Sequence, residues 1–157
     1  MQYQLVDLIK ENHIIVGVEA ETAEEAIRII TQTLENDGYV NPQYAYDVWL
    51  REQTFPTGLP TQPTGIAIPH ADADNVIKSA ITIGILKRPV SFSQMGTDGS
   101  TTVSVQIIFV LAIKEREKQV DMISQLVRLI QSPELLSSLL QVKNAKEVVE
   151  LINRSVK

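Results

Sequence analysis

Apolar residues follow one another closely in four short stretches of the chain, which predicts four β-strands. Continuous apolar runs rich in isoleucine and valine favour the extended state and are typical of strands buried on both faces of an α/β sheet. The densest set of β-branched residues lies between Val103 and Val110. The predicted strands cover residues 14–18, 65–68, 80–86 and 102–113.

Elsewhere apolar residues recur every three or four positions, which predicts helices. The first helix is expected to begin after Thr22, whose side chain can cap an exposed backbone N–H, and to end at Gly38. The pair Asn41-Pro42 predicts the start of a second helix that runs to residue 52. Three more helices are expected near the end of the chain, at residues 118–130, 133–140 and 145–152.

This order of elements predicts one α/β domain over residues 1–157, in which helices flank a β-sheet. A formal net charge of -5 without a dense Lys/Arg run argues against a nucleic-acid partner. The chain has no apolar run of the roughly 20 residues that a membrane-spanning helix needs. It also has no signal-peptide pattern and no cysteine. We therefore expect a cytoplasmic protein without direct membrane insertion, disulfides or thiolate metal sites.

The segment from Gly65 to His70, Gly-Ile-Ala-Ile-Pro-His, is the strongest candidate for chemistry. Pro69 cannot donate a backbone hydrogen bond, so strand pairing is expected to stop there and to present His70 at the strand end. Ligand sites of α/β proteins lie at the carboxyl ends of strands. A neutral imidazole can attack phosphorus and carry a phosphoryl group. An isolated histidine more often has no chemical role, so this interpretation needs a partner group.

Arg51 is the natural partner, because it lies at the predicted end of the second helix, beside a loop that returns to His70. A guanidinium binds phosphoryl oxygens with two parallel hydrogen bonds. Alone, an arginine at a helix end is more often a solvated partner of the helix dipole. Glu52 can orient Arg51 or be exposed. The hydroxyls of Thr57 and Thr64 are auxiliary candidates near the same loop, although each is also typical of a turn.

Two other motifs carry weaker signals. Asp72 and Asp74 follow His70, but two carboxylates and one histidine are a poor metal signature and favour a turn. Gly96 and Gly99 predict a hairpin loop that lacks the lysine and spacing of a phosphate-binding loop. We therefore expect neither a metal nor a cofactor.

Two stretches together carry a resemblance to a known family. Residues 51–59, Arg-Glu-Gln-Thr-Phe-Pro-Thr-Gly-Leu, are followed by Gly-Ile-Ala-Ile-Pro-His at 65–70. This combination resembles the signature of type-2 EIIA domains of the phosphotransferase system (PTS), the fructose/mannitol superfamily. The Phe-Pro-Thr-Gly loop is most similar to the galactitol-specific branch. The resemblance extends loosely over the whole chain and implies a mixed β-sheet with helices on both faces, a phosphorylated histidine at His70 and an active-site arginine at Arg51.

The resemblance also implies a function. Such a domain is a cytoplasmic phosphotransferase component that accepts a phosphoryl group from phospho-HPr on a histidine, here His70. It passes the group to a cysteine of an EIIB domain while the sugar enters and is phosphorylated through EIIC. The alternative is a regulatory module of the same fold, in which the phosphorylation state of His70 controls a partner protein. The sugar cannot be inferred from this chain, because an EIIA domain does not contact it.

The chain departs from the family pattern at one place. The fructose and mannitol branches carry a second active-site histidine at the start of the helix after the long strand, in a His-Leu-x-x-Leu-x-x-Leu pattern. Residues 122–129 keep the apolar spacing, and Met122 stands where that histidine is expected. We therefore expect Arg51, backbone amides or a hydroxyl to replace it, and we favour a galactitol-like or other pentitol or hexitol system.

Overall fold

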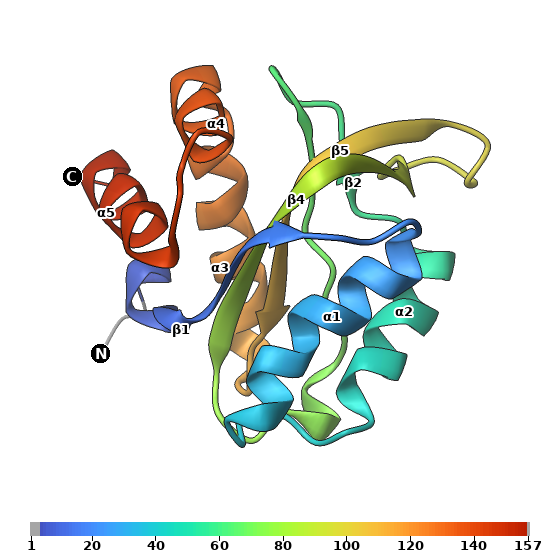
Figure 1. Cartoon of the computed structure of the whole chain (residues 1–157). Helices are drawn as coiled ribbons and strands as arrows, with labels where there is room; N and C mark the ends of the chain where they lie inside the picture. The colour runs from blue at the N-terminus through green and yellow to red at the C-terminus, as the bar shows by residue number, and fades with distance from the viewer. Residues whose placement is uncertain (1–3, 157) are drawn as a thin grey trace.

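The computed structural model describes residues 4–156 and contains a mixed five-stranded sheet (Figure 1). Its outer strand β1 pairs parallel with β4, β4 pairs antiparallel with β5, β5 pairs parallel with β3, and β3 pairs antiparallel with β2. This arrangement confirms the expected mixed sheet. In spatial order the strands are β1 (Ile9–Val18), β4 (Ala80–Ser93), β5 (Thr102–Ala112), β3 (Gly65–Ala67) and β2 (Gly58–Leu59).

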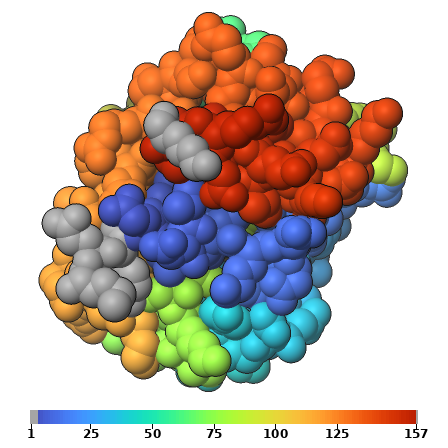
Figure 2. All heavy atoms as spheres, turned by 90° about the vertical axis from the view of Figure 1, so that its left-hand side faces the viewer, coloured from blue at the N-terminus to red at the C-terminus, as the bar shows by residue number. Residues whose placement is uncertain are grey.

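Helices cover both faces of the sheet, each over its own cluster of buried apolar residues. Helices α1 (Ala23–Asn36) and α2 (Tyr44–Thr54) pack side by side on one face. The second face carries α3 (Arg116–Leu129), α4 (Pro133–Leu139) and α5 (Ala145–Ser155). Figure 2 shows α5 beside the segment that contains the short 3-10 helix η1 (Leu5–Leu8) and the start of β1. No helix in the described part of the chain combines the length and apolar character needed to cross a membrane.

Local signals in the sequence explain the starts of α1, α4 and α5 and the end of α1. The Thr22 hydroxyl accepts a hydrogen bond from the Glu25 N–H at 3.1 Å, which caps α1. The chain leaves α1 through Gly38, whose φ of 76° is a left-handed conformation that favours glycine. Ser132 caps α4 and Asn144 caps α5 in the same way as Thr22.

The structure differs from the predicted elements most at four places. Strand β4 continues to Ser93, well beyond the predicted end at residue 86. Strand β1 begins at Ile9, five residues before the predicted start, although its first residues are largely exposed. Helix α2 begins at Tyr44, because Asn41 forms a turn in which its carbonyl accepts from the Tyr44 N–H at 3.0 Å. The loop before β3 contains the two-residue strand β2, which is too short to produce a periodic pattern.

Strand β3 ends at Ala67, two residues before Pro69, where strand pairing was expected to stop. Regular pairing with β5 stops at Ala67, and one isolated bridge follows, between His70 and Leu111. Within it the Leu111 N–H donates to the carbonyl of Pro69 at 3.0 Å, a bond in which a proline can take part because it only accepts. The single bridge therefore holds His70 at the carboxyl ends of two neighbouring parallel strands.

Candidate active site

The imidazole of His70 is oriented by the backbone of its own strand. Its Nδ1 atom lies 2.8 Å from the carbonyl oxygen of Ile68. A carbonyl oxygen only accepts hydrogen bonds, so the proton of the neutral ring is on Nδ1. This tautomer leaves the lone pair on Nε2. His70 is also partly exposed. The hydrogen bond fixes the tautomer, and the partial exposure makes the imidazole a candidate nucleophile at the edge of the sheet.

The surroundings keep the His70 ring neutral. Burial lowers the pKa of His70 below its usual 6.5, and the positive charge of Arg51 lowers it further. The bond to Ile68 and the negative charge of Asp72 raise the pKa, but less than burial lowers it. At pH 7 the imidazole is therefore unprotonated, as attack on phosphorus requires.

Arg51 lies in the last turn of α2, near enough to His70 for its charge to affect the histidine pKa. Its guanidinium carbon lies 5.0 Å from the centre of the Phe55 ring, a cation–π contact. Its Nε is buried and has no hydrogen-bond partner among the described residues. A buried N–H without a partner is costly, so Arg51 has a donor available for an anion.

An open pocket of about 490 Å³ is lined by Asp47, Leu50, Arg51, Thr54, Phe55, Ala71, Asp72, Asp74 and Asn75.

Glu52 and Thr57 are connected to His70 by a chain of hydrogen bonds. The carboxyl of Glu52 accepts the backbone N–H and the hydroxyl of Thr57, both at 2.8 Å. The Thr57 hydroxyl in turn accepts the Ile68 N–H at 3.1 Å, and the Ile68 carbonyl holds the ring of His70. Burial raises the pKa of Glu52 to about 7, although the two bonds from Thr57 lower it. The structure therefore links Glu52 to His70 through Thr57, whereas sequence reasoning considered it a partner of Arg51.

The sequence matches the family described as the phosphoenolpyruvate-dependent sugar phosphotransferase system, EIIA 2, over residues 7–155. The chain belongs to this family. EIIA domains of the family are phosphotransferase components that use a phosphohistidine intermediate, and homologues pass the phosphoryl group to EIIB.

Relatives with this domain are longer proteins. The chain is 29% identical over 157 residues to the mannitol-specific PTS EIICBA component of Vibrio cholerae, covering 98% of this chain and 23% of that protein. It is 32% identical over 128 residues to the transcriptional regulator ManR of Bacillus subtilis, covering 80% of this chain and 18% of the regulator. The chain thus spans about a quarter or less of these relatives.

Solved structures share the fold. The complex of enzyme IIA-Mtl with phosphorylated enzyme IIB-Mtl from Escherichia coli matches with a TM-score of 0.77 and 26% identity, over 94% of this chain and 99% of that one. The nitrogen regulatory protein IIA-Ntr of Neisseria meningitidis matches with a TM-score of 0.75 and 19% identity, over 94% of this chain and 98% of that one. These matches confirm the single mixed α/β architecture.

Thr64 is not near the histidine of this EIIA domain. It precedes β3, and its hydroxyl bonds the carbonyl of Gly65 at 3.3 Å. His70 lies beyond the other end of the strand, six residues on. At roughly 3.3 Å per extended residue the two are on the order of 20 Å apart. The structure therefore brings His70, Arg51, Glu52 and Thr57 together and leaves Thr64 outside the site.

Met122 was assigned the place of the second histidine, whose role was expected to fall to Arg51, backbone amides or a hydroxyl. The polar group that α3 contributes is instead the side chain of Gln119. Met122 is 0% exposed in the apolar cluster between the sheet and the three C-terminal helices. Gln119 lies in the first turn of α3, and its Nε2 donates to the carbonyl oxygen of Ala71 at 3.1 Å. The start of α3 lies beside the His70 bridge because it follows directly after β5. A polar residue in the first turn after β5 is therefore the feature of the sequence that could have identified Gln119.

The two weaker motifs lie at a 3-10 turn and in a hairpin. Asp72 precedes the 3-10 helix η2 (Ala73–Asn75) without a side-chain cap, and Asp74 pairs with Arg116 at 2.9 Å across an exposed surface. No group of three or more His, Cys, Asp or Glu side chains in residues 4–156 is arranged to hold a metal ion. Gly96 and Gly99 form the predicted hairpin between β4 and β5 with φ angles of 79° and 95°.

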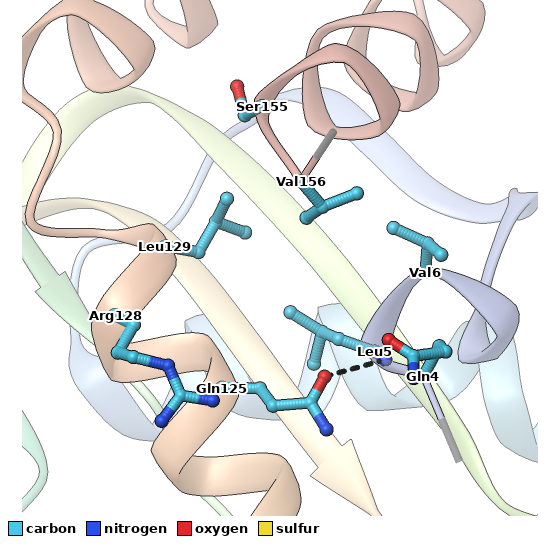
Figure 3. A pocket seen from close by; sticks show the side chains of 8 residues that line it. All are labelled: Gln4, Leu5, Val6, Gln125, Arg128, Leu129, Ser155 and Val156. Atoms are coloured by element: carbon cyan, nitrogen blue, oxygen red, sulfur yellow. Dashed lines mark hydrogen bonds between the residues drawn. The ribbon is translucent and has the colours of Figure 1, made fainter. Parts of the chain in front are cut away.

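A second pocket, of about 290 Å³, lies between η1, α3 and the end of α5 (Figure 3). In it the side chain of Gln125 accepts a hydrogen bond from the Leu5 N–H at 3.1 Å, which attaches η1 to α3. Gln125 is six residues beyond Gln119, about 9 Å farther along the helix. Neither His70 nor Arg51 lines this pocket, so it is separate from the candidate active site. Its lining residues are Gln4, Leu5, Val6, Gln125, Arg128, Leu129, Ser155 and Val156.

Proposed function

We propose that this chain is a phosphocarrier that accepts a phosphoryl group from phospho-HPr on Nε2 of His70 and passes it to a cysteine of EIIB. The observation that supports this most directly is the bond between His70 Nδ1 and the Ile68 carbonyl, because it leaves Nε2 as the ring nitrogen with a lone pair available for attack. In the first step the Nε2 lone pair forms a bond to phosphorus. The bond between phosphorus and the donor's histidine breaks, and that imidazole leaves with the electron pair.

The second transfer repeats the same exchange. A cysteine thiolate of EIIB attacks phosphorus, the bond between phosphorus and Nε2 breaks, and His70 regains its lone pair. Arg51 stabilises the charge on the equatorial phosphoryl oxygens in both steps through its guanidinium, whose buried Nε has no protein acceptor. Both steps need alignment and charge stabilisation, the roles that the proposal gives to His70 and Arg51.

Partner docking is proposed to use the exposed apolar side chains at the end of α2. Leu50 is 45% exposed and Phe55 is 59% exposed, and both line the pocket that contains Arg51. Ala71, at 4% exposure, is too buried to provide contact area. The acidic residues Asp72 and Asp74 lie around the same pocket, so the partner surface that fits here is apolar at its centre and basic at its rim.

The direct test is phosphorylation by purified enzyme I, HPr and phosphoenolpyruvate. The chain should acquire one acid-labile, base-stable phosphoryl group, and ¹⁵N NMR should place it on Nε2 of His70. His70→Ala should not be labelled, whereas Glu24→Gln, an exposed change on α1, should be labelled like the original chain. Normal labelling of His70→Ala, or a phosphoryl group on Nδ1, would contradict the proposal.

A regulatory role is the second candidate, and the match to the transcriptional regulator ManR favours keeping it. In that role His70 is phosphorylated in the same way, but its state controls a partner protein. Chase of the labelled chain with purified EIIB separates the two roles. Transfer to the EIIB cysteine supports a transport role, and a label that stays on the chain supports regulation.

Galactitol, or a related hexitol, is the sugar class we propose for a transport role in the cytoplasm. The Phe-Pro-Thr-Gly loop and the absence of a histidine from α3, where the fructose and mannitol branches carry their second active-site histidine, support this assignment. Rates of transfer to galactitol-, mannitol- and fructose-type EIIB domains, measured side by side, test it. A mannitol- or fructose-type EIIB accepting fastest would contradict the galactitol assignment.

A further inference from the structure

The residue after His70 is held on both sides of its peptide backbone. On the N–H side, the Ala71 N–H donates to the hydroxyl of Tyr44 at 3.2 Å. The same hydroxyl donates to the carbonyl of Leu111 at 2.6 Å. In a regular parallel ladder the Ala71 N–H would bond that carbonyl directly. The Tyr44 hydroxyl is therefore inserted between β5 and the chain that leaves β3, at the residue next to His70.

On the carbonyl side, the donor is Gln119. Its Nε2 donates to the Ala71 carbonyl oxygen at 3.1 Å, from the first turn of α3. Ala71 itself is only 4% exposed, so neither of its backbone groups can rely on water. A helix from each face of the sheet thus supplies one side chain to the same peptide segment.

Tyr44 is suited to a fixed position. Its side chain is 0% exposed at the start of α2, and burial raises the pKa of its hydroxyl, so the group remains a proton donor throughout the neutral range. Its ring packs in the apolar cluster beneath α1 and α2. A buried aromatic ring has little rotational freedom, so the hydroxyl is held where the two backbone groups need it.

We propose that Tyr44 and Gln119 are positioning residues for phosphoryl transfer, because together they fix the backbone that carries the His70 imidazole. The inference rests on the proposed role of His70 and assigns it two further supporting residues. Transfer to Nε2 requires in-line approach, and a displacement of about 1 Å at the nucleophile can slow a reaction up to a hundredfold. Tyr44 is too buried to touch a docked partner, so its loss acts on alignment and leaves binding intact.

The experiment compares two variants with two matched controls. Tyr44→Phe removes only the hydroxyl, and Gln119→Met removes the amide donor without adding charge. Tyr39→Phe makes the first change at a partly buried tyrosine whose ring packs near His13. Gln131→Met makes the glutamine-to-methionine change just past the end of α3. The side chain of Gln131 donates to the carbonyl of Val127 within the helix.

Rapid-quench transfer from phospho-HPr gives the limiting rate and the half-saturating concentration of the donor. Tyr44→Phe and Gln119→Met should each lower the limiting rate by about 10-fold to 100-fold. The half-saturating concentration should stay within about twofold of the original chain, and both controls should match that chain. Because Tyr44 is buried, circular dichroism is used to check that Tyr44→Phe is folded. If it is not, the Gln119→Met variant still tests the inference, since Gln119 is partly exposed.

¹⁵N NMR of the unphosphorylated chain supplies a second readout, the fraction of His70 that carries its proton on Nδ1. Both variants should lower this fraction, since a looser backbone weakens the bond to Ile68. Unchanged limiting rates, or a loss confined to the half-saturating concentration, would overturn the inference. A chain that phospho-HPr does not label at all would remove the proposed function instead, and the tautomer comparison would still test whether Tyr44 and Gln119 position the ring.

Discussion

Replacing Glu52 by glutamine is expected to remove a pH dependence from the stability of the fold. Glu52 is 5% exposed, and burial raises its pKa from 4.5 to about 7. Between these two values the folded chain keeps the Glu52 proton that the unfolded chain has lost. The contribution of Glu52 to the free energy of unfolding is therefore fully present below about pH 4.5 and is lost as the pH rises through 7. At about 1.4 kcal/mol per pKa unit, the loss amounts to about 3 kcal/mol.

The histidine of the site acts in the opposite direction. The pKa of His70 is lowered, so just below pH 6.5 the unfolded chain binds more protons than the folded chain, and stability rises with pH there. The pH profile of the original chain mixes both effects. Subtracting the profile of Glu52→Gln isolates Glu52, because His70 is present in both chains. The hydrogen bond to Thr57 that the glutamine cannot accept costs about 1–3 kcal/mol at every pH and leaves the slope unchanged.

Urea unfolding followed by the fluorescence of Trp49, the single tryptophan, measures the free energies. Between about pH 5 and pH 8 the stability of Glu52→Gln relative to the original chain should rise by about 2 to 3 kcal/mol. Glu24→Gln, at an exposed position of α1, is the control for the loss of one negative charge. A stability difference between Glu52→Gln and the original chain that stays constant across this range would refute the reasoning about the buried carboxyl.

Four further outcomes are expected. Arg51→Lys keeps the charge but loses the two-pronged donor, so rapid-quench assays should show transfer about tenfold slower, and an unchanged rate would exclude a guanidinium-specific role. The labelling rate should be constant above pH 6.5 and fall at lower pH as His70 becomes protonated, whereas a rate that increases on acidification would contradict the neutral-nucleophile assignment. Leu50→Ser should raise the half-saturating phospho-HPr concentration without lowering the limiting rate, which donor titration measures. Gly84→Ala places a Cβ against the side chain of Ile30, so urea unfolding should show a loss of about 1–3 kcal/mol, and full stability would mean that the contact relaxes.

Periodicity predicted the regular elements well where a segment has one buried face. Thr22, Ser132 and Asn144 begin helices with caps that a local pattern can specify. The start of α2 was predicted too early, because Asn41 is followed by a proline and forms a turn instead of a cap. A two-residue strand such as β2 exists only through its neighbours, so no pattern along the chain announces it.

The candidate site divides in the same way. Pro69 and the apolar run before it were sufficient to present His70, and proximity along the chain connected it to Arg51. The role of Glu52 could not be predicted, because its bonds to Thr57 depend on how the loop after α2 folds back beneath the strand. Gln119 was missed because apolar spacing identified a core position, Met122, and carried no information about which polar side chain the helix turns toward the histidine.

The sequence by itself predicted the order of the longer strands and helices, the family, and a candidate nucleophile with a candidate cation, since these depend on residues within short stretches of chain. Only the tertiary structure decided which atom of His70 is free to react and what keeps it in place. Tyr44 and Gln119 meet at Ala71 although they are 27 and 48 residues away from it. Hydrogen bonds act over about 3 Å, so their partners are set by the packing of helices on both faces of the sheet.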